Sequence, residues 1–154
     1  MIVRDAMPAD AEEACEVMRA SIAELCVPDH RNDPDILRRW LGNKTPEHFE
    51  AWPIDRGISL LVAVEDGAII AVGSIRNDGE ILLNYVAPAA RFRGASTALL
   101  KALERRAAER GNSQCKLVST KTAHRFYLAR GYTDIGTSES MFGTSACYLM
   151  SKTI

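Results

Sequence analysis

Residues 86–96 bring together the residue types that bind phosphate groups. Arg91, Arg93 and Gly94 stand between an apolar strand pattern and a long helical pattern that begins directly after the glycine. The first turn of a helix presents free backbone N–H groups and the positive end of the helix dipole, which together attract anions. Glycine lets the backbone come close to a phosphate, and arginine matches the geometry of its oxygens. The segment predicts an anion site. An ordinary strand-to-helix turn with solvated arginines is the alternative.

The two most common nucleotide loops are absent from the chain. It contains neither G-x-x-x-x-G-K-[ST], the loop of nucleotide hydrolases, nor G-x-G-x-x-G, the dinucleotide fingerprint. The segment instead resembles the acetyl-CoA loop of the GNAT superfamily of N-acetyltransferases, whose pattern V-x-P-x-x-[QR]-x-x-G-x-[GA] leads into a helix. Its matching positions here are Val86, Pro88, Arg91, Gly94 and Ser96. Ser96 departs from the usual Gly or Ala, but serine is small and can donate a hydrogen bond to a phosphate.

A second stretch resembles a later motif of the same family, A-x-x-F-Y-x-x-x-G-[FY]. It reads Ala123, Phe126, Tyr127, Gly131 and Tyr132. Thr120 stands where the family often has an asparagine, three residues before the alanine, at a contact with the pantetheine arm. Because both motifs occur in the expected order and on the expected elements, the chain is identified as a member of the family.

The resemblance implies a mixed α/β (α+β) fold, with a splayed and mostly antiparallel sheet of about six or seven strands flanked by helices. Acetyl-CoA is the implied co-substrate and lies in the splay, beside an amine acceptor. The strand ending at Val86 offers its backbone to the pantetheine amides, and the Val86 N–H polarises the thioester carbonyl. The implied cofactor-binding residues are Val86, Ala87, Arg91, Phe92, Arg93, Gly94, Ala95, Ser96, Thr97 and Thr120.

Two residues are candidates for proton transfer. The resemblance places Tyr127 where a general acid reaches the sulfur of coenzyme A. The alternative is an aromatic residue that packs in the core and satisfies its hydroxyl locally. Glu80 lies six residues before Val86, like the glutamate base of the histone-acetylating branch of the family. That spacing covers about 20 Å of strand, so the base would act through water. The alternative for Glu80 is a solvated carboxylate after a turn.

Asp29, His30 and Asn84 are polar candidates for the acceptor pocket, which we expect from the first two helices and their connections. Cys26 can also face that pocket, but nothing beside it indicates an activated thiolate, so an acetyl-cysteine route is not expected. A mild acidic excess in residues 24–50 favours a cationic amine, unless those charges are simply solvated. The aromatic residues that either wall this pocket or fill the core are Trp40, Phe49 and Trp52.

The elements that position these residues follow from hydrophobic periodicity. Asp66-Gly67 between two apolar runs is a strong hairpin signal. Strands are expected at 2–6, 59–65, 68–75, 80–86 and 116–119, with two more near the C-terminus, the last at about 146–150. The first helix is expected to have Pro8 in its first turn, an apolar face over 14–25 and an end at 27–30. Further helices are expected over 35–41, after Pro46, from 95 to Gly111 and over 123–130, where His124 should be exposed.

The bulk composition narrows the function class. The 154 residues predict one domain, residues 1–154. A net charge of -1 argues against a nucleic-acid partner, and no apolar run is long enough for a membrane span. The four cysteines have no metal-ligand spacing, so no metal is expected. Without a signal peptide, reduced thiols in the cytoplasm are the expectation. The oligomeric state stays open, with a homodimer among the options.

The expected function is an N-acetyltransferase that uses acetyl-CoA and transfers the acetyl group directly in a ternary complex. A non-catalytic CoA-binding regulatory domain of the same fold is the main rival. Tyr127 argues against that rival, whereas the departures at Thr120 and Ser96 favour it slightly. A protein-binding module without a cofactor would leave residues 86–96 unexplained. The acceptor can be a small molecule, an amino acid or a protein amine.

Overall fold

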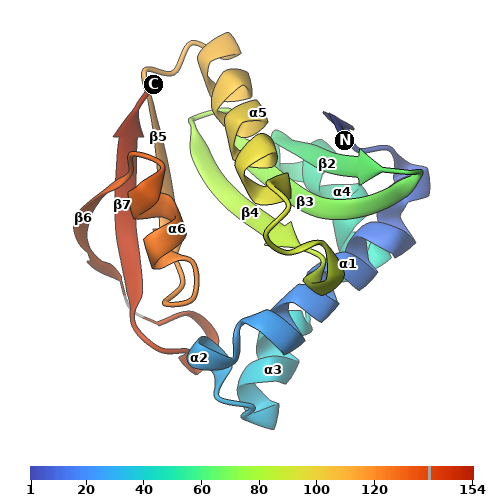
Figure 1. Ribbon diagram of the computed structural model, residues 1–154, viewed down its shortest axis with the longest axis vertical. Coiled ribbons are helices and arrows are strands. Elements are labelled where there is room, and N and C mark those ends of the chain that lie inside the picture. The colour runs from blue at the N-terminus through green and yellow to red at the C-terminus, as the bar shows by residue number, and fades with distance from the viewer. Residues whose placement is uncertain (139) are drawn as a thin grey trace.

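The computed structural model describes residues 1–138 and 140–154. Seven strands form one sheet in the order β1-β2-β3-β4-β5-β7-β6, in which only the β4–β5 pair is parallel (Figure 1). The strands are β1 Ile2–Asp5, β2 Ile58–Glu65, β3 Ala68–Arg76, β4 Glu80–Val86, β5 Gln114–Ser119, β6 Thr133–Ser138 and β7 Cys147–Thr153. The expected mixed fold with a mostly antiparallel sheet is confirmed.

Six α-helices accompany this sheet in the described part of the chain. They are α1 Ala11–Leu25, α2 Val27–His30, α3 Pro34–Leu41, α4 Pro46–Arg56, α5 Ala95–Glu109 and α6 His124–Ala129. The prediction of a break at 27–30 was incomplete. These residues form the short helix α2, which has Pro28 in its first turn and ends at Arg31, where the backbone turns left-handed with φ of 54°.

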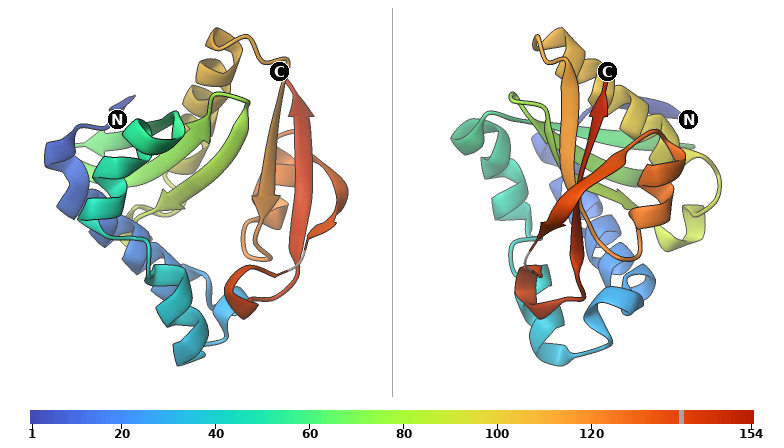
Figure 2. Two further views of the ribbon diagram at one scale, coloured as in Figure 1. Left: turned by 180° about the vertical axis from the view of Figure 1, so that it is seen from behind. Right: turned by 90° about the vertical axis from the view of Figure 1, so that its left-hand side faces the viewer.

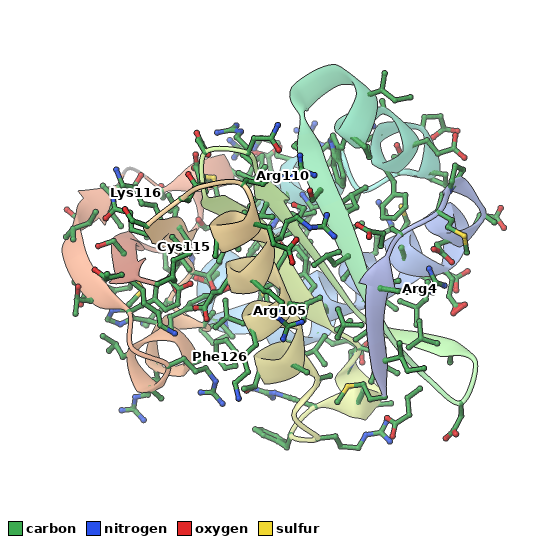
Figure 3. The ribbon with its side chains drawn as sticks, turned by 90° about the horizontal axis from the view of Figure 1, so that it is seen from above. Arg4, Arg105, Arg110, Cys115, Lys116 and Phe126 are labelled. Atoms are coloured by element: carbon green, nitrogen blue, oxygen red, sulfur yellow. The ribbon has the colours of Figure 1, made fainter. Side chains whose placement is uncertain are left out.

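The sheet is split into two wings because β4 and β5 pair over a very short stretch. Their register joins Glu80 to Lys116 and Ile81 to Leu117, and beyond these residues the strands diverge (Figure 1). We call β1–β4 the first wing and β5–β7 the second wing. Seen from above, α5 lies against β2, β3 and β4, with Cys115 of β5 on one side of the helix and Arg4 of β1 on the other (Figure 3). A cleft lined by residues of β4, α5 and α6 lies where the strands separate.

Both faces of the first wing are covered by helices. The side chains of Leu99 and Leu103 on α5 approach Gly73 of β3 so closely that a Cβ there would lie 3.0 Å from each. Phe49 and Trp52 on α4 pack on the opposite face, which Figure 2 shows from behind. Phe49, Trp52 and Trp40 are buried core residues, so the sequence alternative of a pocket wall is wrong for all three.

The turn between β2 and β3 has the conformation that its residues favour. Asp66 and Gly67 both have positive φ, 51° and 79°, as the two-residue hairpin signal predicts.

One expectation about α6 is wrong. His124 is not fully exposed: its ring stacks on Tyr148 with a centroid distance of 3.8 Å, and its Nε2 lies 2.8 Å from a carboxylate oxygen of Asp134. The stacking explains why its side chain is only 20% exposed.

Three further observations concern disulfides, membrane spans and metal sites. All four cysteines are free and buried. None of the helices that the structure describes has the length and apolar character of a membrane span. Across residues 1–138 and 140–154, no cluster of three or more His, Cys, Asp or Glu side chains could hold a metal ion.

Lys44 is a buried cation beneath α1 and α3. Its ammonium contacts only the carbonyl oxygen of Trp40 and the side chain of Asn43 among the described residues, and its side chain is almost fully covered. Burial lowers the pKa of Lys44 to about 8. The unfolded chain therefore binds more protons than the folded chain between pH 8 and about 10.4, and stability must rise with pH across that window.

We expect Lys44→Met to remove this dependence. Relative to the variant, the wild-type free energy of unfolding should rise by about 1.4 kcal/mol per pH unit between pH 8 and 10. Urea unfolding of both proteins at several pH values measures the difference, and other titrating groups cancel because both proteins share them. Parallel pH profiles would show that Lys44 keeps an ordinary pKa in the folded protein.

Candidate active site

The cleft between the wings has a volume of about 400 Å³. Its walls come from the end of α1, the end of β4, the start of α5, the β5–α6 loop and α6. The described residues that line it include Val86, Arg91, Phe92, Gly94, Ala95, Ser96, Thr97 and Thr120 from the predicted cofactor set, together with Tyr127 and Asn84. Two sequence motifs that are distant along the chain thus meet in one cavity.

The loop before α5 has the backbone geometry of an anion site. Gly94 is the N-cap of α5 in a left-handed conformation with φ of 83°, and no side chain caps the first turn. The N–H groups at the start of a 15-residue helix are therefore available to a ligand. Phe92 also has a positive φ, 65°. The residue is 91% exposed, and the Arg91 guanidinium lies over one face of its ring. An exposed aromatic side chain in this unfavourable conformation marks a functional loop.

Two predicted cofactor residues lie outside the cleft lining. Ala87 is partly buried against the core, and its N–H donates to the Ile70 carbonyl oxygen at 2.8 Å. Arg93 points instead toward Glu65, with 3.7 Å between the charged groups. We therefore do not assign a direct cofactor contact to either side chain.

Arg130 is a cleft residue that the sequence analysis missed. Its guanidinium lies 4.0 Å from the ring centre of Phe126, and its Nε donates to the Thr97 hydroxyl at 2.9 Å. These contacts join α6 to the first turn of α5 across the cleft. The spacing of Phe126 and Arg130, four residues apart on a helix, was the signal that could have revealed the pair.

Tyr127 is buried at the inner wall of the cleft. Burial raises the pKa of its hydroxyl to about 12, and a hydrogen bond with Asn84 offsets part of that rise. The hydroxyl therefore keeps its proton at neutral pH. The Asn84 Oδ1 atom is buried and has no hydrogen-bond partner. Buried oxygens are normally paired, so this unpaired acceptor on a cleft residue is unusual.

The far end of the cleft, near α1, is lined by Ser21, Leu25, Cys26 and Tyr85. The Tyr85 hydroxyl accepts a hydrogen bond from Trp40 Nε1 at 3.1 Å, which fixes the ring as a wall. Burial raises the pKa of the Cys26 thiol to about 12, so it stays protonated. In the sequence, Ser21 interrupts the apolar stripe of the first helix, which was the signal for this wall.

The structure does not bring Glu80 to the cleft. Glu80 begins β4, whereas the cleft lies at the other end of that strand, near Val86. Its carboxylate accepts a hydrogen bond from Arg76 at 2.7 Å instead. Asp78, in the preceding turn, accepts from the Glu80 N–H. Glu80 is therefore not a catalytic residue of this cleft. Spacing along the strand predicted its distance from Val86 but not which residues surround its carboxylate.

Asp29 and His30 are buried outside the cleft lining. His30 uses both ring nitrogens locally: Nε2 lies 2.9 Å from the Ile22 carbonyl oxygen, and Nδ1 accepts from the Asn32 N–H. The Asp29 carboxylate binds backbone N–H groups of the β5–α6 loop. Neither residue can meet an acceptor amine directly, so both acceptor assignments are wrong. The polar atoms of both side chains already have hydrogen-bond partners inside the protein, and the sequence pattern does not reveal these partners.

The acidic excess of residues 24–50 also does not reach the cleft. Asp33 caps α3 and Asp35 pairs with Arg38 and Arg39. No described residue that lines the cleft is an Asp, Glu or His, and its charged groups are Arg91 and Arg130. The prediction of a cationic acceptor therefore has no support in this part of the structure.

The split sheet, the uncapped start of α5 and the buried Tyr127 thus come together at one cleft. A family model described as an acetyltransferase (GNAT) domain matches residues 37–153, and the chain belongs to that family. No curated protein sequence matches the chain.

Solved structures agree with this family. A GCN5-related N-acetyltransferase from Rhodopseudomonas palustris has a TM-score of 0.87 at 25% identity, over 99% of this chain and 95% of that one. The PaiA N-acetyltransferase of Thermoplasma acidophilum, solved with coenzyme A, gives 0.83 at 20% identity over 99% and 98%. An aminoglycoside 6'-N-acetyltransferase from Enterococcus faecium gives 0.74 at 15% identity over 99% and 97%. The last two show a shared fold.

Proposed function

We propose that this protein transfers the acetyl group of acetyl-CoA to an amine by direct attack in a ternary complex. The observation that carries the proposal is the meeting, in one cleft, of the uncapped start of α5 and the buried hydroxyl of Tyr127. The free N–H groups at the start of α5 can bind a phosphate group, and the Tyr127 hydroxyl can protonate a departing thiolate. These are the two ends of the reactive arm of acetyl-CoA.

Three features of the cleft support the binding of acetyl-CoA along its length. The pyrophosphate is held by the N–H groups that follow Gly94, with Arg91 supplying charge. Residues 82–86 of β4 have no strand partner on the side of β5, so the backbone groups that face that side are free to bind the pantetheine amides. The relative from Thermoplasma acidophilum was solved with coenzyme A, which supports the same ligand here.

The chemical step forms a C–N bond and breaks a C–S bond. The amine nitrogen attacks the thioester carbonyl carbon, and the sulfur leaves with the electron pair of the C–S bond. Tyr127 transfers its hydroxyl proton to that sulfur as it leaves, because the hydroxyl retains its proton at neutral pH, and the tyrosine then regains a proton from water. The proton lost by the nitrogen balances the one gained by the thiol. Asn84 lines the cleft and is the polar residue that we place beside the incoming amine.

The acceptor amine must reach the carbonyl carbon uncharged. Since the described lining of the cleft offers no carboxylate or imidazole, the amine loses its proton to water. Transfer rates should therefore favour amines whose own pKa is low.

The activity is tested by release of free coenzyme A thiol from acetyl-CoA across a panel of amines, beside calorimetric binding of coenzyme A. Thiol release that requires both protein and amine supports the proposal. Tight binding of coenzyme A without turnover for any amine would instead support the non-catalytic regulatory domain.

We expect Cys26→Ala to keep most of the activity. Cys26 lines the cleft, but its thiol has a pKa of about 12 and is a poor nucleophile at neutral pH. Double-reciprocal plots should intersect, as they do for a ternary complex. Parallel lines, or an acetyl adduct in the intact mass that disappears in Cys26→Ala, would show a covalent route instead.

A further inference from the structure

The two wings need a connection at the open end of the cleft. They are joined through β4 and β5 at Glu80–Ile81, but not farther along these strands. At the open end, α2 lies between the end of α1 and the loops of the second wing (Figure 1). This short helix is the structural bridge there, and its contacts come mainly from Asp29.

The Asp29 side chain holds the β5–α6 loop by three hydrogen bonds. One carboxylate oxygen accepts from the Lys121 N–H at 2.7 Å, and the other accepts from the Thr122 N–H at 3.2 Å and from the Thr122 hydroxyl. Asp29 is completely buried. Charge-assisted hydrogen bonds of this kind are stronger than neutral ones, and burial strengthens them further.

The backbone of α2 holds the loop before β7 as well. The Ser145 N–H donates to the Asp29 carbonyl oxygen at 3.1 Å, and its hydroxyl donates to the Pro28 carbonyl oxygen at 2.9 Å. Arg31, just after α2, donates to the Ser145 hydroxyl and to the Gly143 carbonyl oxygen. One four-residue helix thus binds two loops of the second wing.

On its other side, α2 is fixed to α1 and α3. His30 Nε2 bonds to the Ile22 carbonyl oxygen of α1, and the His30 ring meets Trp40 edge-on at 6.3 Å. Trp40 in turn donates to the hydroxyl of Tyr85, a wall of the cleft. The contacts run from the wall of the first wing through α2 to the second wing.

The loop that Asp29 holds is the one that carries the site. Thr120, Thr122 and Ala123 line the cleft, and α6 with Tyr127 begins directly after them. We propose that Asp29 is a positioning residue that sets the width of the cleft and the place of residues 120–123, so that coenzyme A affinity depends on a carboxylate outside the cleft. This inference rests on the proposed function, since it concerns the same ligand.

The test is the affinity of Asp29→Asn for coenzyme A, measured by calorimetry well below the melting temperature of the variant. Asparagine places an NH₂ donor against donors of the loop, which should shift residues 120–123. We expect coenzyme A binding to weaken by up to about 10- to 100-fold, because binding would then have to restore the loop order that hydrogen bonds to a charged group maintain in the wild type. The amides of Lys121 and Thr122 should also exchange hydrogen faster than in the wild type.

Asp33→Asn is the matched control. Its carboxylate also accepts two backbone N–H groups, those of Asp35 and Ile36, but both of these donors belong to α3 and neither lies in the second wing. We expect this variant to keep nearly all of its stability, because asparagine caps a helix about as well as aspartate, and to keep its affinity for coenzyme A. Unchanged affinity in folded Asp29→Asn, or an equal loss in Asp33→Asn, would overturn the proposal. No binding by the wild type would overturn the proposed function itself.

If Asp29→Asn does not fold, Thr122→Val carries the test, because it removes one of the three donors. The Lys121 amide should then exchange faster and coenzyme A should bind more weakly, while Thr122→Ser, which keeps the hydroxyl, should restore both. Unchanged exchange of the Lys121 amide in Thr122→Val would overturn the proposal even if affinity fell, because it would show a direct contact only.

Discussion

Tyr127→Phe should lower kcat by about 10²- to 10⁴-fold, the range typical of a lost general acid. The substitution removes one oxygen and keeps the ring, which packs edge-on against Phe126 and Tyr132. The fold and the affinity for coenzyme A should therefore survive. Because the hydrogen bond to sulfur strengthens as charge develops, the effect belongs to kcat more than to binding. Steady-state kinetics with an identified acceptor, beside calorimetry, measure both quantities.

Tyr132→Phe provides the matched control. Tyr132 is equally buried and donates to Glu104 at 2.8 Å, but it does not line the cleft. Its variant should lose stability and keep its turnover, which is the reverse of Tyr127→Phe. Wild-type turnover in Tyr127→Phe would remove the acid role and transfer it to another donor. A parallel fall in turnover, coenzyme A affinity and melting temperature would indicate that Tyr127 only packs.

Gly94→Pro should abolish detectable binding of coenzyme A. Proline requires φ near -65°, whereas Gly94 has φ of 83° at the N-cap of α5. The substitution must turn the loop away from the conformation that exposes the first N–H groups of the helix. Calorimetry on folded protein, with circular dichroism to confirm the helix content, measures the loss.

Alanine substitutions separate backbone strain from binding. Gly94 and Gly67 both have positive φ, and a Cβ on either would meet no atom within 4 Å. Gly94→Ala and Gly67→Ala should therefore cost a similar amount of stability, about 1 kcal/mol. Only Gly94→Ala should weaken coenzyme A binding, because Gly67 lies in the β2–β3 turn. Equal affinity in the two alanine variants would argue against a ligand at Gly94.

The sequence allowed prediction where the chemistry is local along the chain. The loop from Val86 to Ser96 is contiguous, so glycine, arginine and helix start were visible together. The hairpin at Asp66-Gly67 was predictable for the same reason, since two residues determine the turn. Tyr127 was placed through a resemblance between motifs, and it lies in the same cleft as that loop.

Contacts between distant segments were not predictable. Asp29 and Thr122 are 93 positions apart, and no periodicity indicates that the carboxylate binds that loop. For Glu80, the spacing from Val86 did not show which neighbour would take its charge, and Arg76 does so. Arg130 was missed because its role arises from Phe126 beneath it and Thr97 across the cleft. Such contacts depend on how the two wings meet.

The central claim is that coenzyme A lies between the wings, with its phosphates at the start of α5. Amide hydrogen exchange with and without coenzyme A tests this most directly. We predict that coenzyme A slows exchange at residues 95–97 and along residues 82–86 of β4, while β1 and the β2–β3 turn stay unchanged. Saturating coenzyme A that leaves exchange at 95–97 and 82–86 unaltered, or that protects other segments instead, would contradict the account.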